Sequence, residues 1–233
     1  MLPAASSRSG FPLLAAPLAL LALAAAPFAR VAVARSSPAR ARQDAPPAAK
    51  PLTYDEMVAR LEKGDLSVDY TQLRLKYAAT PGYEPEAGTP LIKPMYAALN
   101  QKDYKLALDT ANTLLKRQYV NIDAHIIASL AYDGLADKSQ AEIHHDIAIG
   151  LINSILHSGS GASTASPYVV ISVAEEYALM RVMGWQPRKQ SYLHEGKRSF
   201  DQMEVFDTRN NSDLTLYFDC TLSDSALEKA LKH

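Results

Sequence analysis

The sequence offers little that could cross-link the chain or bind a metal in a recognisable pattern. Cys220 is the single cysteine among 233 residues, so an intramolecular disulfide is excluded. The spacings H-E-x-x-H, H-x-H and C-x-x-C are all missing. The sequence therefore predicts no motif-defined metal site and no cofactor.

The sequence also lacks an apolar run of the ~20 residues that a membrane-spanning helix needs. The longest such run, Phe11–Ala26, has 16 residues and contains two prolines. Arg8 precedes it, and Ala32-Val33-Ala34 has the small-x-small form that signal peptidase accepts. We expect residues 1–34 to be a signal peptide cleaved after Ala34, with no stable membrane span afterwards, and the mature protein to be periplasmic or secreted. An uncleaved anchor is the alternative.

An excess of positive charge is missing from the body of the chain. Residues 1–50 hold six basic residues and one acidic residue, which leaves 18 basic and 24 acidic residues beyond them. Because duplex binding needs a basic face, nucleic acid is not expected as a partner. Residues 35–52 are rich in proline, alanine and arginine and indicate a flexible linker.

Helical patterns dominate the first half of the predicted domain, residues 53–158. Thr53-x-x-Glu56 is a capping-box pattern that starts the first helix, and a period from Leu66 to Tyr77 predicts the second. Thr89 before Pro90 indicates the start of a third helix. Further helical patterns cover about 91–100, 103–118, 122–135 and 138–157.

Two of these helix pairs repeat one another. Ala107 and Ala141 occupy equivalent places 34 residues apart, which is the period of tetratricopeptide repeats. The tryptophan and glycine positions usual in the first helix of that repeat are not filled. We therefore expect tetratricopeptide-like helical hairpins, whose concave face could bind a peptide or protein.

The C-terminal half, residues 167–222, shows the alternation typical of strands. We expect strands at Tyr168–Val173, at about 188–194, at Ser199–Phe206 and at Leu214–Leu222, with Cys220 on the apolar side of the last. A short helix capped by Ser223 then covers residues 223–233. Residues 53–222 are thus predicted to form a single α+β domain, with the helical hairpins packed on an antiparallel β-meander.

The segment Glu175 to Val182 is ambiguous between helix and strand. Its residues have good helix propensity and Gly184 could end a helix, but Tyr177, Leu179 and Arg181 also alternate. Because its neighbours form a meander, we favour a strand.

Several short motifs together resemble a known family. They are Asp69-Tyr70-x-x-Leu73-Arg74-x-x-Tyr77, Gly150-Leu151-Ile152-x-Ser154-Ile155, Val173-x-Glu175-Glu176-Tyr177 and Leu216-Tyr217-Phe218-Asp219. The combination, over residues 54 to about 222, is similar to an uncharacterised bacterial family, Domain of Unknown Function 4919. The resemblance implies an exported bacterial protein and supplies no catalytic residues.

Histidines and glutamates are the candidates for chemistry. His125 lies in one helix and the adjacent His144 and His145 in the next, so at most one of the adjacent pair faces a given partner. We expect one histidine bonded between helices and one solvated.

The adjacent side chains of Glu175 and Glu176 also point in different directions, so acid–base catalysis would require a further carboxyl such as Asp201 or Asp219. The simpler expectation is one glutamate paired with Arg74 or Arg181 and one solvated.

The candidate residues support three hypotheses. The leading one is a non-enzymatic protein-interaction module of the cell envelope with a protein or peptide partner, for which Tyr132, His145, Glu175 and Tyr177 are the binding candidates. The alternative is an exported, metal-assisted hydrolase with His125 and Glu176 as catalytic candidates. A structural envelope protein without a small ligand is the third. A deep pocket at His125, Glu176 and Tyr177 would favour the hydrolase, and a filled interhelical groove the third hypothesis.

Overall fold

The computed structural model describes residues 51–231. The predicted signal peptide and almost all of the predicted linker lie outside the described residues. The helices are α1 (Tyr54–Leu61), α2 (Tyr70–Ala78), α3 (Thr89–Asn100), α4 (Tyr104–Leu115), α5 (Ile122–Gly134), α6 (Lys138–Leu156), α7 (Val173–Met183) and α8 (Thr221–Ala230). The strands are β1 (Tyr168–Val169), β2 (Trp185–Glu195), β3 (Arg198–Asp207) and β4 (Ser212–Asp219).

The first helices begin where side chains satisfy free backbone N–H groups. The Thr53 side chain accepts from the Glu56 amide, and the Glu56 carboxylate accepts from Thr53 in return, as the capping-box pattern predicts. The second helix starts at Tyr70 and not at Leu66, because the Asp69 carboxylate caps it through the Gln72 amide.

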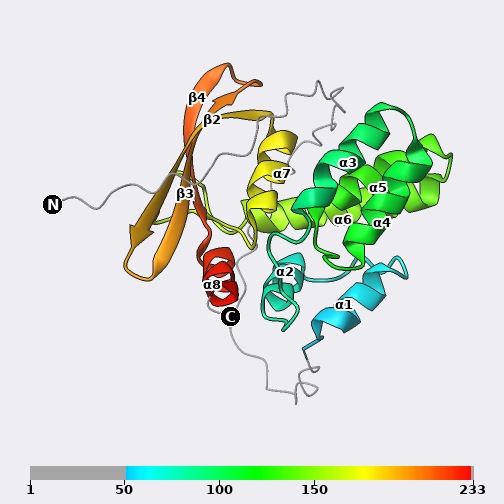
Figure 1. Cartoon of the computed structure of the whole chain (residues 1–233), viewed down its shortest axis with the longest axis horizontal. Helices are drawn as coiled ribbons and strands as arrows, with labels where there is room; N and C mark the ends of the chain where they lie inside the picture. Colours follow the sequence, from blue (N-terminus) through cyan, green and yellow to red (C-terminus); the bar gives the residue numbers. More distant parts are fainter. Residues whose placement is uncertain (1–50, 232–233) are drawn as a thin grey trace, which may run out of the picture. The chain divides into compact units, whose positions relative to one another are not determined.

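Helices α3 to α6 form two hairpins on one side of the described structure (Figure 1). Ala107 on α4 and Ala141 on α6 are both buried, as close packing of helices spaced by 34 residues requires. A small core rich in alanine and leucine lies between α3, α4 and α5. The predicted boundaries of these four helices agree with the structure to within about three residues.

The sheet has the strand order β1-β4-β3-β2. The three long strands form the predicted antiparallel meander, with Met203 opposite Leu216 and Gln190 opposite Met203. Gly196, at φ +63°, opens the two-residue turn between β2 and β3, as a type II′ hairpin requires. The short β1 pairs with β4 in parallel, so the sheet is mixed, not wholly antiparallel.

The segment favoured as a strand at Glu175 to Val182 is helical, and this prediction was wrong. The Ser172 hydroxyl accepts from the Glu175 amide at the start of α7, and Gly184, at φ +72°, ends the helix in the left-handed conformation. These caps and the good helix formers between them prevail over the resemblance to neighbouring strands. The same helix start limits β1 to two residues, so the longer strand predicted to Val173 is also wrong.

The end of the chain also departs from expectation. Strand β4 stops at Asp219, and Leu222 is on the first turn of α8 with 39% of its surface exposed. Helix α8 begins at Thr221, so Ser223 is not its N-cap; the Ser223 hydroxyl donates to the Cys220 carbonyl instead. Cys220 follows the strand and is buried.

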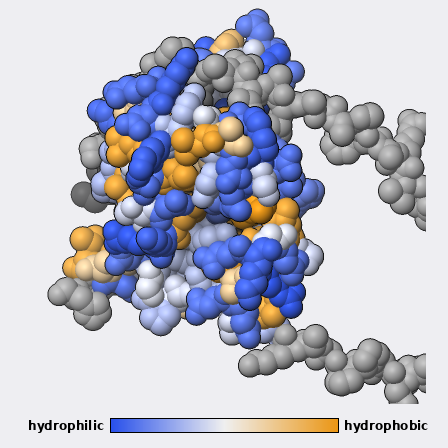
Figure 2. Space-filling model, turned by 90° about the vertical axis from the view of Figure 1, so that its right-hand side faces the viewer, coloured by the Kyte–Doolittle hydropathy of each residue, from blue (hydrophilic) through white to orange (hydrophobic). Residues whose placement is uncertain are grey.

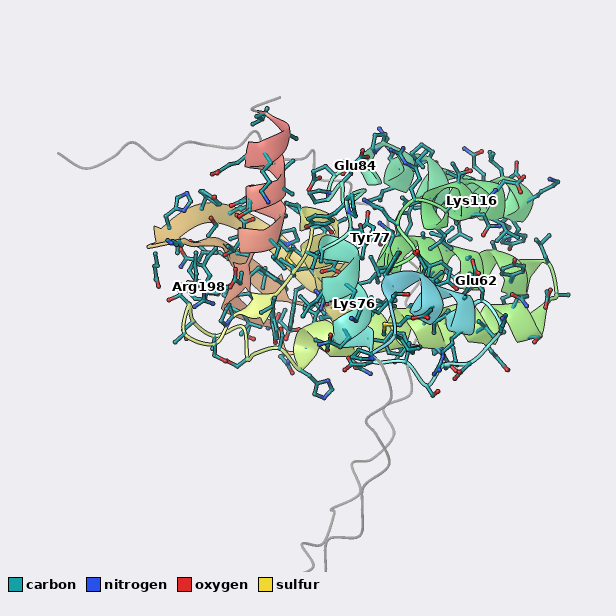
Figure 3. All side chains as sticks on the ribbon, turned by 90° about the horizontal axis from the view of Figure 1, so that it is seen from below. Glu62, Lys76, Tyr77, Glu84, Lys116 and Arg198 are labelled. Atoms are coloured by element: carbon teal, nitrogen blue, oxygen red, sulfur yellow. The ribbon has the colours of Figure 1, made fainter. Side chains whose placement is uncertain are left out.

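The architecture is α+β, with mostly N-terminal helices packed on a C-terminal mixed sheet. Helix α7 lies between the sheet and the helical hairpins (Figure 1). A continuous core joins both halves, with Leu73 from α2, Leu151 from α6, Leu179 from α7 and Phe218 from β4. Tyr77 of α2, near the middle of the view from below in Figure 3, packs its ring against those of Tyr54 and Tyr83.

Candidate functional site

Glu175, at the start of α7, forms the centre of a buried ion pair. The Arg74 guanidinium donates from Nε to Glu175 Oε1 over 2.8 Å and from Nη2 to Oε2 over 2.6 Å. It also donates to Ser154 of α6 and to the Val169 carbonyl of β1. The Ile171 amide donates to the same carboxylate. This two-pronged pair ties α2, α6, β1 and α7 together.

The pairing of one glutamate with Arg74 follows the sequence-based expectation, but the solvated second glutamate does not. Glu176 is fully buried. Helical geometry turns adjacent side chains about 100° apart, and at this position both directions point into protein. One direction meets Arg74 of α2, and the other faces the sheet.

Glu176 faces a second buried carboxyl, Asp201 of β3, which is also fully buried. No amide, guanidinium or hydroxyl donor among residues 51–231 lies within hydrogen-bonding distance of either Glu176 oxygen. Burial raises the pKa of Glu176 well above its usual value, and the nearby Asp201 carboxyl raises that pKa further. Both effects favour the neutral carboxylic acid form of Glu176.

A third carboxyl comes from α8. Asp224 is 5% exposed and accepts a hydrogen bond from the Tyr192 hydroxyl of β2. It also raises the pKa of Glu176. We call Glu176, Asp201 and Asp224 the acidic cluster; its members come from α7, β3 and α8. Burial, with the charges of Asp201 and Asp224, raises the pKa of the Cys220 thiol, so this cysteine is not a reactive thiolate.

The acidic cluster has the electronic arrangement of an acid–base pair, but a substrate cannot reach its carboxyl groups. Two carboxyls in contact, one of them neutral, can divide the roles of acid and base. A catalytic carboxyl must also reach the proton it transfers, within about 3.2 Å or through one water. Glu176 and Asp201 both have 0% of their surface exposed. A cleft of about 10 Å³ that reaches Glu175, Ser172 and Asn121 is lined by neither Glu176 nor His125.

His125 and His144 form a pair of rings buried between α5 and α6. His125 Nε2 lies 2.7 Å from the Tyr119 carbonyl, which can only accept, so Nε2 carries the proton. Burial lowers the pKa of His125 to about 3, so the ring is neutral and its Nδ1 is an acceptor. His144 Nδ1, 2.9 Å away, must then donate to it. Burial also lowers the pKa of His144.

The other candidate residues do not join these two groups. Tyr132 stacks its ring on His144 with 5.5 Å between ring centroids. His145 is on the exposed side of α6, with its Nδ1 3.1 Å from the Asp146 carboxylate. Tyr177 is half-buried near Glu176 and Asp201, and burial with these carboxyls raises its pKa. The candidates therefore divide between an interhelical ring cluster and the surroundings of α7.

The face that α3 and α5 share, where a tetratricopeptide-like array would bind a peptide, is contacted by Arg181 of α7. Arg181 of α7 donates to Asp123 of α5, and its guanidinium lies over the Tyr96 ring of α3 at 5.5 Å from the centroid. The Tyr96 hydroxyl donates to the same aspartate over 2.7 Å. The chain's own helix thus contacts the expected concave face at Asp123 and Tyr96.

One family profile, described as Domain of unknown function (DUF4919), matches residues 48–229. The chain belongs to this family. No curated protein and no solved structure matches it. The resemblance found in the short motifs is therefore confirmed, and its span agrees with the matched region.

Within the described part of this DUF4919 chain, no three histidine, cysteine, aspartate or glutamate side chains are grouped so that they could hold a metal ion. The two rings at His125 and the carboxyls at Glu176 belong to separate clusters, and neither cluster assembles a ligand set. No helix among residues 51–231 combines the length and the apolar character that crossing a membrane requires.

Sequence reasoning missed Asp224 and gave Asp201 only as one of two options. A signal for Asp201 was present, because it alternates with Met203 and Val205, and the period of a strand places all three on the buried face. Asp224 gave no comparable signal, since its neighbours predicted a surface helix start. Asp224 is buried because β4 ends at Asp219 and α8 begins at Thr221. The sequence pattern had placed this boundary too late in the chain.

Proposed function

We propose that this DUF4919 protein is an exported, non-enzymatic protein-interaction module of the bacterial cell envelope. The observation that carries the proposal is the contrast between its buried reactive groups and its free strand edge. His125, Glu175 and Glu176 are all buried, whereas β2, an edge strand of 11 residues, has β3 as its sole neighbour in the described sheet. Strand edges bind other strands through backbone hydrogen bonds.

The free edge replaces the concave helical face as the expected binding element. Figure 2, which views the helical side, shows separate apolar areas divided by polar ones and no continuous apolar band. Exposed large apolar side chains on the helices, such as Leu106 and Leu135, support no extended groove by themselves. Along β2, by contrast, Gln190 and His194 are exposed at the outer edge of the sheet.

Export is supported by the apolar run at residues 11–26 and the small-residue site ending at Ala34. N-terminal sequencing of the protein from a bacterial envelope fraction tests this part, and the expected first residue is Arg35. An intact N-terminus in the cytosol would overturn it.

Photocrosslinking in cells tests the interaction. A photoreactive amino acid at Gln190, on the free edge, should give a defined crosslinked product. The matched control places the same group at Lys105, whose side chain on α4 is 82% exposed, and should give none. Products from Lys105 alone would move the interaction to the helices, and no product from either position would refute the module.

The alternative hydrolase has one observation in its favour, the raised pKa of Glu176 beside a second carboxyl. In its metal-assisted form it predicts bound metal in the purified protein and a rise in melting temperature on adding zinc. A metal-free preparation with a melting temperature that does not change on adding zinc would refute the metal-assisted hydrolase hypothesis.

A further inference from the structure

We propose that α8 is a lid over the acidic cluster and that it opens by turning about Thr221 while the rest of the described domain stays folded. Opening exposes the Cys220 thiol and admits solvent to Glu176 and Asp201. The proposal goes beyond the proposed function and does not depend on it. Three features of α8 carry it: which side chains it buries, where it is anchored and what lies beneath it.

Helix α8 is attached without the apolar packing that holds the other helices. Its two buried residues, Ser223 and Asp224, are both polar. Within residues 51–231, neither hydrophobic core includes a side chain of α8. Leu222 is 39% exposed and Leu231 87%, whereas α7 buries Leu179 fully in the core. Because segments with few buried apolar contacts open at a low free-energy cost, α8 can open without unfolding the domain.

The anchor of α8 lies at its first residue. The Thr221 hydroxyl donates to the Asp219 carboxylate over 2.5 Å and accepts from the Ser199 amide over 3.0 Å. The Cys220 amide donates to the Ser199 carbonyl. In the next turn the Asp224 amide donates to the Cys220 carbonyl, a bond that stays within the start of the helix. Thr221 is therefore the fixed point about which the rest of α8 turns.

The Asp224 side chain connects the lid to the interior. Its carboxylate accepts from the Tyr192 hydroxyl and from the Cys220 thiol, whose sulfur is 3.7 Å away. Asp224 also raises the pKa of Glu176, so each of these carboxyls disfavours the charged form of the other. Polar contacts thus close the lid against an opposing carboxyl, and no apolar burial has to be undone when it opens.

The groups beneath α8 are sealed in the closed structure. Cys220 is 1% exposed, and Glu176 and Asp201 are fully buried. The three carboxyls of the acidic cluster all raise the pKa of the Cys220 thiol, which places the thiol beside the cluster. Helix α8 packs against β3, the strand that carries Asp201, and extends outward from the sheet in Figure 3. Lifting α8 therefore removes one cover shared by the thiol and the carboxyls.

Cys220 measures the opening directly, because it is the single cysteine of the chain. The processed protein is treated with N-ethylmaleimide across a urea series below the unfolding transition, and labelling is followed by mass spectrometry. If α8 opens as a lid, the labelling rate should be almost independent of urea, since the opening exposes little surface. A rate that follows the full urea dependence of global unfolding from zero urea upward would overturn the proposal.

A matched pair of variants at Ser225, an exposed position of α8, separates the lid from the fold. Ser225→Pro removes an interior helix amide and breaks α8. Labelling of Cys220 should then rise by about tenfold or more, with the urea midpoint of unfolding unchanged. Ser225→Ala keeps the helix and should label like wild type. A proline variant that unfolds the whole domain, or that labels no faster than wild type, would overturn the lid.

Carboxyl labelling tests what the lid covers. A water-soluble carbodiimide with glycine ethyl ester converts exposed carboxyls to amides, which peptide mass spectrometry locates. Glu176 and Asp201 should react in Ser225→Pro and stay unmodified in Ser225→Ala. Glu204, whose side chain on β3 is 49% exposed, is the control and should react equally in both. Faster thiol labelling without modification of either buried carboxyl would overturn α8 as the cover of the acidic cluster.

Discussion

The helical half and the sheet half each bury a pair of titratable side chains against a neighbouring element. In the helical half the pair is His125 and His144, and in the sheet half it is Glu176 and Asp201. Burial lowers the pKa of His125 to about 3 and raises the pKa of Glu176 well above its usual value. One cause, desolvation, thus favours the neutral form of both groups.

The two pairs respond to pH in opposite directions. His125 has a lower pKa in the folded state than in the unfolded state, so its contribution to stability is present above pH 6.5 and is lost as the pH falls toward 3. Glu176 has a higher pKa in the folded state, so its contribution is present below about pH 4.5 and is lost as the pH rises. The comparison predicts separate acid and alkaline limbs of stability, each traceable to one half.

The largest expected effect comes from cutting the ion pair that joins the halves. Arg74→Met leaves the Glu175 carboxylate buried without its partner, and we expect unfolding free energy to fall by about 3–5 kcal/mol in urea denaturation. The double variant Arg74→Met with Glu175→Leu should lose less than the single variant, because no buried charge remains. The exposed pair of Arg117 and Glu84 provides the control, where Arg117→Met should cost under about 1 kcal/mol. Equal losses at both sites would contradict the role of burial.

The helical half could be predicted closely from sequence, because its signals are local. The capping box at Thr53, the proline after Thr89 and the alanines at 107 and 141 each act within a few turns of their own helix. The boundaries in the sheet half depended instead on where one element ends and the next begins, which the alternating sequence pattern does not show. Whether Glu175 lies in a helix or a strand was decided by the caps at Ser172 and Gly184; the sequence indicated Gly184 as a possible helix end, but the Ser172 cap was not recognised.

The candidate site was predicted in its parts but not in its assembly. Pairing of a glutamate with Arg74 or Arg181 was expected because structural ion pairs are commoner than catalytic carboxylates, and the structure pairs Glu175 with Arg74. A histidine bonded between helices was expected in the same way. The contact of Glu176 with Asp201 required knowing that β3 lies beside α7, and the sequence gave only the face of each side chain. The free edge of β2 depends on strand order, which no short-range pattern reports.

Replacing Glu176 in the sheet half should abolish the loss of stability as the pH rises. Glu176→Gln keeps the shape and cannot ionise, so wild type should lose up to about 1.4 kcal/mol per pH unit relative to the variant as pH rises above the carboxyl's unfolded value. Urea denaturation across a pH series measures this difference. Glu204→Gln, at an exposed position of β3, is the matched control. A parallel pH profile for wild type and Glu176→Gln would show that Glu176 does not titrate as proposed.

Removing the base of the helical half should flatten the acid limb. His125→Gln eliminates the proton that the unfolded chain gains between about pH 6.5 and 3, and it costs about 1–3 kcal/mol at neutral pH through lost buried hydrogen bonds. Chemical unfolding at pH 7 and pH 5 separates the two effects. His145→Gln, on the exposed side of α6, should change neither. If the acid limb persists in His125→Gln, another group causes it.

The smallest effect tests the helix that separates the halves. Ser172→Ala removes the side-chain acceptor at the start of α7, and we expect a loss of about 1 kcal/mol at all pH values, since no titrating group is removed. Ser172→Asp should retain the cap, because aspartate accepts from the same amide.

The comparison with Thr53→Ala on α1 shows whether the location of the lost cap matters. Fraying of α1 exposes one edge of the helical half, whereas fraying of α7 begins beside Glu175 and Glu176. Hydrogen exchange should therefore report faster amide exchange around both glutamates in Ser172→Ala and only local change in Thr53→Ala. Identical exchange patterns would mean that α7 does not couple the two buried pairs.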